Sequence, residues 1–252
     1  MKNAIRRHSG YQATQSIALL CALVLGPANL ASALEPAGET TSEERINQAR
    51  PNTQLALSAE EIREAEQRLS GLGYWTGPVD GVLDVGSRHA LIAFQKVEDR
   101  QRTSTLTLEE LQAIRTAKRP PSREIDYAHL EIDLSRQVLF AVDSSGVVSK
   151  ILPVSTGTGK LFTSEGRTRR AVTPCGRFTI THKIAGWRKS PLGLLYYPNY
   201  ITGGVAIHGN PLVPVYPASH GCIRIPMFAA KEFSETNPVG TVVIVYYSES
   251  VE

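Results

Sequence analysis

A cysteine and two histidines, His208, His220 and Cys222, lie within fifteen residues of one another in the segment VAIHGNPLVPVYPASHGCIRIP (205–226). A cysteine attacks a carbonyl carbon as the thiolate, and a nearby imidazole can accept the thiol proton. His220 and Cys222 are two positions apart, so an extended backbone points both side chains to the same side. Gly221 leaves space for a substrate carbonyl, and its N–H could help bind the oxyanion.

Residue chemistry alone leaves three interpretations of this group open. The first is a buried structural cysteine with two structural histidines. The second is a zinc site made of His208, His220 and Cys222, since His and Cys are usual zinc ligands, although no CxxC or HExxH pattern accompanies them. The third is a cysteine nucleophile with a histidine base, which the Gly- and Pro-rich, loop-like surroundings of Cys222 favour.

The elements that must position these residues have a hydrophobic period of about two. One segment, 226–235 (PMFAAKEFSE), predicts a helix with Pro226 near its first position. His208 follows the apolar run 205–207, which would fix it at a strand end. The sequence therefore predicts a mostly β, sandwich-like domain with one helix near the site. The predicted strands are 129–134, 137–142, 147–155, 176–184, 204–209 and 240–247.

A smaller module, 55–116, has helical periodicity instead. Ser58 with Glu61, and Thr107 with Glu110, match the capping-box pattern that begins a helix. A turn rich in Gly, Pro and Asp follows the first helical segment. Three short helices with one apolar face each can form a small bundle. We therefore predict a three-helix bundle ahead of the β domain.

Two segments without apolar periodicity separate these parts of the 252-residue chain. Residues 34–54 are polar and predict a flexible tether. Residues 117–125 (AKRPPSREI) contain adjacent prolines flanked by charges and predict a stiff linker. With 42% hydrophobic and 20% charged residues, the chain is neither disordered nor fibrous. The predicted fold class is α+β in two domains, 55–116 and 126–247.

The first 33 residues have the pattern of a secretory signal peptide. They combine three basic residues near the start, a short apolar core at 17–25, and the small-x-small sequence Ala31-Ser32-Ala33. The apolar core is too short for a membrane span, and an uncleaved amphipathic anchor is the alternative. Without residues 1–33 the chain has 24 basic and 24 acidic residues, so its charge is no argument for a nucleic-acid partner. We expect export to the periplasm or cell wall.

The β domain resembles the L,D-transpeptidase catalytic domain of the YkuD type over roughly Asp126 to Tyr247. The resemblance is carried by Ser219-His220-Gly221-Cys222-Ile223-Arg224, Ile207-His208-Gly209, Ile132-Asp133-Leu134-Ser135, Val154-Ser155-Thr156-Gly157 and Thr173-Pro174-Cys175-Gly176-Arg177-Phe178.

The helical module resembles a peptidoglycan-binding domain of the three-helix type. Its similar residues are Gly73-Tyr74, Gly77, Asp80-Gly81, Ala90 and Phe94-Gln95. A generic small bundle is the alternative, and the neighbouring wall-directed domain favours the binding module.

The resemblance implies that Cys222 is the nucleophile and that His208 is the base, with its ring oriented by the carbonyl of Gly209. His220 and Gly221 would line the oxyanion side. The implied reaction is acylation by a peptidoglycan tetrapeptide stem with loss of D-Ala, followed by attack of a second stem's amine to give a 3–3 cross-link. It implies no metal, cofactor or nucleic acid, and it implies that carbapenems acylate the enzyme. Candidate substrate-binding residues are Ser219, Arg224, Trp187 and Tyr197.

Several alternatives stay open at this point. The same thioester could be hydrolysed, as in an L,D-carboxypeptidase, or passed to a wall-protein amine, and a non-catalytic peptidoglycan-binding protein is a further possibility. Arg224 could form a surface ion pair, and the aromatic residues could pack beneath a loop. The arginines in 167–170 could face anionic wall polymers or lie in a solvated loop. Cys175 replaces the usual threonine, and we hypothesise a reversible disulfide between Cys175 and Cys222.

Overall fold

The structure is a computed structural model that describes residues 57–248. The predicted signal peptide (1–33) and tether (34–54) lie outside the described residues. Within the described range, none of the helices has the length and the apolar character needed to cross a membrane.

Side-chain caps begin the three helices of the N-terminal module. Ser58 Oγ accepts from the N–H of Glu61, and the Glu61 carboxylate accepts from the N–H of Ser58, so the predicted capping box is confirmed. At Thr107 only half of the predicted box forms. Thr107 Oγ1 accepts from the N–H of Glu110, but the Glu110 carboxylate pairs with Arg100 at 3.0 Å. The helices are α2 (Ala59–Leu72), α3 (Val85–Val97) and α4 (Leu108–Thr116).

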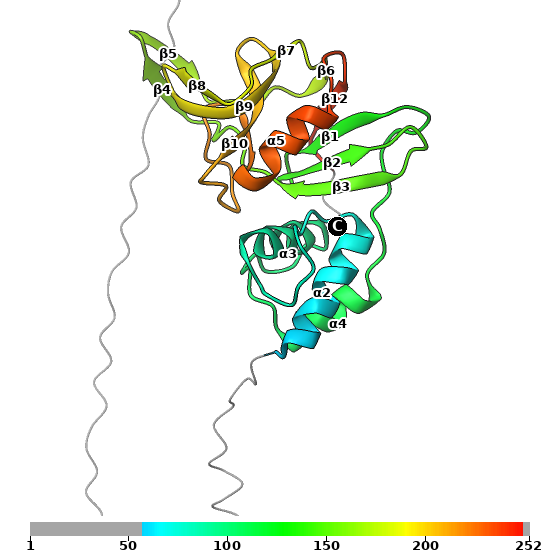
Figure 1. The fold of residues 1–252 in the computed structure, drawn as a ribbon. Helices are drawn as coiled ribbons and strands as arrows, with labels where there is room; N and C mark the ends of the chain where they lie inside the picture. The colour runs from blue at the N-terminus through cyan, green and yellow to red at the C-terminus, as the bar shows by residue number, and fades with distance from the viewer. Residues whose placement is uncertain (1–56, 249–252) are drawn as a thin grey trace, which may run out of the picture. The chain divides into compact units, whose positions relative to one another are not determined.

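Two sheets and a separate hairpin form the larger domain (Figure 1). The first sheet has the strand order β3-β2-β1-β12-β6, and the second has the order β11-β10-β9-β7, with β8 paired to β9. Helix α5 (Met227–Thr236) lies against β9 and β10. The strands are β1 (His129–Asp133), β2 (Val138–Val142), β3 (Val148–Pro153), β4 (Leu161–Ser164), β5 (Arg167–Arg170), β6 (Gly176–Thr179), β7 (His182–Lys183), β8 (Trp187–Ser190), β9 (Gly193–Thr202), β10 (Val205–Asn210), β11 (Ile223–Pro226) and β12 (Val242–Tyr246).

The predicted strand 176–184 is two strands in two different sheets. β6 pairs with β12 of the first sheet, whereas β7 pairs with β9 of the second. The chain crosses between them where Ile180 N–H donates to Thr241 and Thr181 N–H donates to Tyr200. A period of two runs through this crossing unbroken, so the sequence alone shows one strand.

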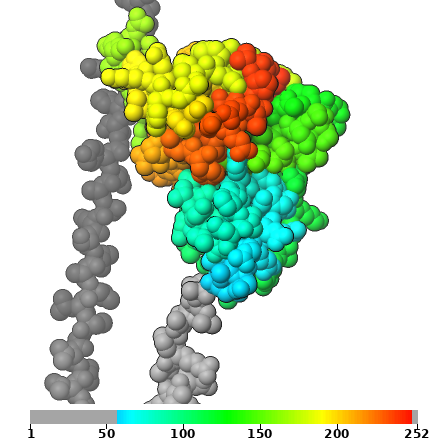
Figure 2. Space-filling view, in the orientation of Figure 1, coloured from blue at the N-terminus to red at the C-terminus, as the bar shows by residue number. Residues whose placement is uncertain are grey.

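The helical module and the β domain share a hydrophobic core. Buried side chains of the module, including Leu91 and Phe94, lie in one cluster with Phe140 and Ile151 of the first sheet. Figure 2 shows the module's surface directly against that of the β domain.

The segment after α2 also adds to the edge of β3. Ile151 N–H donates to the Gly73 carbonyl at 2.7 Å, and Trp75 N–H donates to the Ile151 carbonyl at 3.1 Å. The Trp75 side chain then packs in the core of the β domain. The predicted linker, 117–125, contains neither helix nor strand.

The residues by which the module resembles a peptidoglycan-binding domain are mostly structural. Tyr74 and Phe94 are buried and meet edge to face with ring centroids 5.7 Å apart. Ala90 is fully buried, and Gly73 is the C-cap of α2. These positions therefore build the bundle rather than an exposed binding surface.

Candidate active site

Two parallel strands bring His208 and Cys222 to the same cavity. His208 lies on β10 and is the Cα partner of Arg224 on β11, and Cys222 is the residue immediately before β11. The cavity has a volume of about 430 Å³, and both residues line it. Ser219, His220, Gly221 and Arg224 line it as well. The pairing of β10 with β11 thus assembles most of the predicted site.

His208 is held as a neutral imidazole. Its side chain is buried, and Nδ1 donates to the carbonyl of Gly209 at 2.9 Å. A carbonyl can only accept, so Nδ1 carries the proton of the neutral ring and Nε2 has a free lone pair. Burial lowers the pKa of His208 to about 4, with the charge of Arg224 acting in the same direction and the Gly209 hydrogen bond opposing it.

Gly209 is required here by close packing as well as by its carbonyl. A Cβ at this position would lie 2.6 Å from the Cβ of Ala230, so α5 approaches β10 closely only because the residue is glycine. The carbonyl that orients His208 is consequently fixed between a sheet and a helix.

Cys222 rests as a thiol. Its Sγ donates to the carbonyl of Gly204 at 3.7 Å, and the side chain is half-buried. Burial raises the pKa of the thiol, while the N–H of Ala206 and the charge of Arg224 oppose that rise. Burial also lowers the pKa of Arg224. With the thiol pKa raised and the imidazole pKa lowered, Cys222 and His208 are both neutral rather than a thiolate–imidazolium pair.

The loop around Cys222 is closed by its own hydrogen bonds. Gly221, at φ +133°, donates from its N–H to Ser219 Oγ at 3.0 Å, and Ser219 Oγ donates to the carbonyl of Cys222 at 2.5 Å. Thr173 Oγ1 donates to the Gly221 carbonyl at 2.7 Å. The N–H that we predicted as an oxyanion donor therefore already has an acceptor, and the visible role of Gly221 is to shape the loop.

Comparison with known proteins agrees with this geometry. The pattern of the L,D-transpeptidase catalytic domain matches residues 127–245, and the pattern of a peptidoglycan binding domain matches residues 58–114. The crystal structure of an L,D-transpeptidase from Xylanimonas cellulosilytica is 34% identical, covers 78% of this chain and 100% of its own, and superposes with a TM-score of 0.73. The chain belongs to the L,D-transpeptidase family.

A second solved L,D-transpeptidase, from Stackebrandtia nassauensis, is 19% identical, with a TM-score of 0.46, 81% of this chain covered and 100% of its own. No curated protein matches the chain. With its peptidoglycan-directed domains, this L,D-transpeptidase is an enzyme that acts at the cell wall or in the periplasm.

His220 lies at the exposed side of the transpeptidase cavity. Its ring meets that of Phe162, from β4, with centroids 4.7 Å apart. Both residues line the cavity. His220 therefore connects the loop around Cys222 to the β4–β5 hairpin.

Two aromatic residues predicted to bind substrate do not line this cavity. Tyr197 has a φ of +47° and packs against the hydrophobic core, where its ring meets that of Tyr196. Trp187, on β8, is 53% exposed and also packs on Tyr196. Of the two interpretations left open for these aromatics, packing beneath the loop describes Tyr197.

Basic residues that the sequence left unassigned do reach the cavity. Arg169 and Arg170 lie on β5, and Arg188 lies on β8; all three line the cavity beside Arg224. The cluster of arginines in 167–170 was the available signal, but its strand is exposed at every position and has no alternating apolar pattern. The four arginines outnumber the acidic residue of the lining, Glu165, so the cavity has a positively charged wall that suits carboxylates.

The remaining alternatives concern Cys175 and zinc. Cys175 and Cys222 are both free thiols, and Cys175 is exposed and does not line the cavity. Across residues 57–248, no group of three or more His, Cys, Asp or Glu side chains is arranged to hold a metal ion. The donor arrangement that the zinc interpretation needs is therefore not formed in the described part of the chain.

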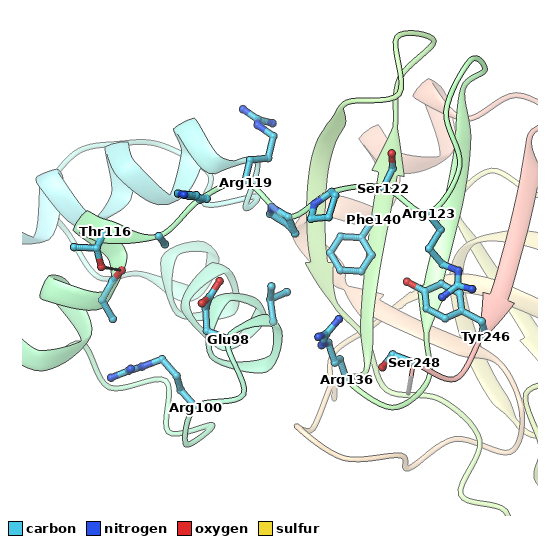
Figure 3. Close-up of a pocket in the computed structure, with 16 residues that line it drawn as sticks. Glu98, Arg100, Thr116, Arg119, Ser122, Arg123, Arg136, Phe140, Tyr246 and Ser248 are labelled. Carbon is cyan, nitrogen blue, oxygen red and sulfur yellow. Dashed lines mark hydrogen bonds between the residues drawn. The ribbon is translucent and has the colours of Figure 1, made fainter. Parts of the chain in front are cut away.

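A larger cavity, of about 790 Å³, lies at the contact of the helical module with the first sheet (Figure 3). Its labelled side chains include Arg119, Arg123 and Arg136, together with Tyr246. None of the predicted catalytic residues lines it. His208, His220, Gly221 and Cys222 line the smaller cavity instead.

The raised thiol pKa predicts how Cys222 reacts with a thiolate-specific reagent. The rate of alkylation by iodoacetamide at Cys222 should rise about tenfold per pH unit from pH 7 to pH 9, because only the thiolate reacts. Mass spectrometry of the peptide that contains Cys222 separates this rate from that of Cys175. A fast rate that does not change between pH 6 and pH 8 would contradict the neutral pair.

Proposed function

We propose that this L,D-transpeptidase forms 3–3 peptidoglycan cross-links through a thioester on Cys222. The observation that carries the proposal is the geometry of His208. Its Nδ1 is fixed on the Gly209 carbonyl, which leaves Nε2 as the acceptor in the cavity that Cys222 also lines. A positioned acceptor beside a thiol is the requirement of a cysteine acyltransferase.

The first half-reaction acylates the enzyme. Cys222 Sγ turns from the Gly204 carbonyl toward His208 Nε2 and attacks the carbonyl carbon of the third stem residue. The S–C bond forms as the thiol proton passes to Nε2. The C–N bond to D-Ala then breaks, and His208 returns the proton to the leaving amine, so that the ring is neutral again.

The second half-reaction forms the cross-link. The side-chain amine of another stem attacks the thioester carbon, and His208 Nε2 takes its proton. An amide bond forms, the C–S bond breaks, and Cys222 Sγ recovers the proton. Because the acceptor must reach the thioester through the same cavity, the entering amine excludes water when it binds well.

Charges along the cavity wall suit the stem peptide. We propose that Arg224 and Arg188 hold its carboxylates. Ser219 and His220 would contact the stem from the loop that joins β10 to β11, residues 211–222, which we call the nucleophile loop because Cys222 ends it. Trp187 and Tyr197 do not line the cavity, so these two are not included. The helical module is proposed to bind peptidoglycan and raise the local substrate concentration.

The proposal also includes export of the protein from the cytoplasm. The pattern of residues 1–33 supports cleavage of a signal peptide after Ala33 and delivery to the periplasm or wall.

The test is mass spectrometry of the protein after incubation with a disaccharide-tetrapeptide, beside the Cys222→Ala variant. A cross-linked dimer and an acyl adduct that both need Cys222 are expected. Tripeptide without dimer would replace the proposal by an L,D-carboxypeptidase in which water is the acceptor. Neither product nor adduct from the unaltered protein, and no adduct with a carbapenem, would leave a peptidoglycan-binding protein.

A further inference from the structure

The amine of Lys96 is buried where the helical module meets the β domain. Lys96 lies near the end of α3 and is 0% exposed. Its Nζ donates to the backbone carbonyls of Gln137 at 3.0 Å and Val154 at 2.9 Å. It has no carboxylate partner among the residues the structure describes. Burying an amine without an anion costs folding free energy. The hydrogen bonds to the two carbonyls offset part of that cost, and they link Lys96 to the β domain.

The second of these carbonyls, that of Val154, begins the segment 154–156, which binds the nucleophile loop. Gln137 also binds this segment through its side chain, since its Nε2 donates to Thr156 Oγ1 at 2.7 Å and its Oε1 accepts from the N–H of Thr156 at 2.9 Å. The carbonyl of Thr156 then accepts from the N–H groups of Ala218 and Ser219, each at 2.9 Å. The contacts therefore run without a gap from Lys96 to the loop.

The same segment also binds the chain on both sides of Cys222. Ser155 and Arg224 exchange two backbone hydrogen bonds, at 3.0 and 3.1 Å. Ser155 Oγ donates to the carbonyl of Tyr216 at 2.8 Å. Cys222 lies between these two attachment points, so its position follows the position of Ser155 and of Thr156 beside it.

A second basic residue of the module reaches the nucleophile loop. Arg102 Nη1 donates to the carbonyl of Val215 at 3.0 Å. Burial lowers the pKa of Lys96 to about 7, and the charge of Arg102 adds to that effect. Burial lowers the pKa of His89, on the same helix, and the charge of Lys96 acts in the same direction. The module therefore donates hydrogen bonds to backbone carbonyls of the β domain from two side chains, Lys96 and Arg102.

We propose that Lys96 is a positioning residue for the acylation of Cys222, through which the helical module holds the nucleophile loop in its reactive geometry. This rests on the proposed role of Cys222 as the nucleophile. The module then helps to position the nucleophile loop, in addition to its proposed role in binding peptidoglycan. Without the amine, the segment that begins at Val154 loses its support from α3, and the loop that it binds gains freedom.

The test is Lys96→Met, which keeps the length of the side chain and removes its donors. The rate of Cys222 acylation by a carbapenem at saturation should fall roughly 10- to 100-fold, because small displacements of reacting groups have effects of this size. The concentration for half-maximal rate should change by less than about twofold, since the cavity wall is untouched. Rates are measured well below the thermal midpoint of each variant.

Lys150→Met is the matched control. Lys150, on β3, also contacts the module, with its Nζ 4.3 Å from the ring centre of Trp75, and it pairs with Glu232 at 3.6 Å. No hydrogen bond leads from its amine to the nucleophile loop. We expect its acylation rate to match that of the unaltered protein. A folded Lys96→Met protein with an unchanged rate constant and a lowered thermal midpoint would reduce Lys96 to a stability role and overturn the proposal.

A second variant covers the case in which Lys96→Met does not fold. Gln137→Asn suits the φ of +61° at this position, because asparagine tolerates the left-handed region, and its shorter side chain cannot reach Thr156. The same fall in rate is expected, and an unchanged rate would overturn the proposal. Failure of the unaltered protein to form any adduct would instead overturn the proposed function, so the two failures are distinguishable.

Discussion

Replacement of His208 by alanine is expected to lower the rate of Cys222 acylation by the tetrapeptide about 10²- to 10⁴-fold, the usual contribution of a positioned general base. The thiol pKa is raised by burial, so almost no thiolate exists at neutral pH without a proton acceptor. His208 Nε2 is the acceptor that the Gly209 hydrogen bond leaves free. The measurement is the single-turnover acylation rate, with His182→Ala as the control because His182 lies outside the cavity.

The pH dependence adds a signature to the same comparison. A base works only when unprotonated, and the pKa of His208 is lowered to about 4. The acylation rate of the unaltered protein should therefore hold from neutral pH down to about pH 5 and fall as the pH passes through about 4. His208→Ala should lack this limb. A fall centred near pH 6.5 would mean that the imidazole is not buried as described, and an unchanged rate in His208→Ala would remove it from the mechanism.

Gly221→Ala is expected to have the second large effect, lowering the acylation rate about 100-fold. The φ of +133° at this position is one that residues with a Cβ rarely adopt, and the added Cβ would lie 2.9 Å from the carbonyl oxygen of Val172. That oxygen belongs to backbone and cannot turn away. The residue immediately before Cys222 must therefore move, together with the bonds of its N–H to Ser219 and its carbonyl to Thr173.

Gly240→Ala separates the contact from the backbone conformation. Gly240 also has a positive φ, of +93°, but a Cβ there meets nothing within 4 Å. Both variants carry a strain of about 1–3 kcal/mol, and only Gly221→Ala carries the collision beside the nucleophile. Equal acylation rates in the two variants would show that the shape of the loop does not set the reactivity of Cys222.

The parts of the site that the sequence predicts are local ones. His220, Gly221 and Cys222 are neighbours in the chain, and the apolar run before His208 indicates its strand, so residue type and spacing suffice. His208 lies within β10 rather than at the predicted strand end, because the pairing with β11 continues to Asn210. Contacts between strands that are distant in the sequence are not predicted in this way. That β10 lies parallel to β11, and that Arg188 of β8 reaches the same cavity, depends on pairings between distant segments. A period of two shows that a strand exists and says nothing of its neighbour.

Elements without an alternating pattern also escape sequence reasoning. The β4–β5 hairpin is exposed or half-exposed throughout, so it has no buried face to produce a period. Lys96 lies on the buried face of α3, whereas a lysine in a helical pattern is expected to face the solvent. Trp75 lies in a turn of the module yet packs in the β core. The sequence shows the module and the β domain as separate, because the core that joins them is formed only by tertiary contacts.

The segment that follows α2 has a further consequence for the β domain. β3 is the outer strand of the five-stranded sheet, and Tyr74 bridges Ile151 on its open side. An uncovered outer strand with apolar neighbours is a template for pairing with other molecules. Phe140 and Val148, buried here under the module, would be uncovered with it. By covering this strand, the peptidoglycan-binding module also protects the β domain against self-association. A catalytic domain produced without the module would be prone to aggregate.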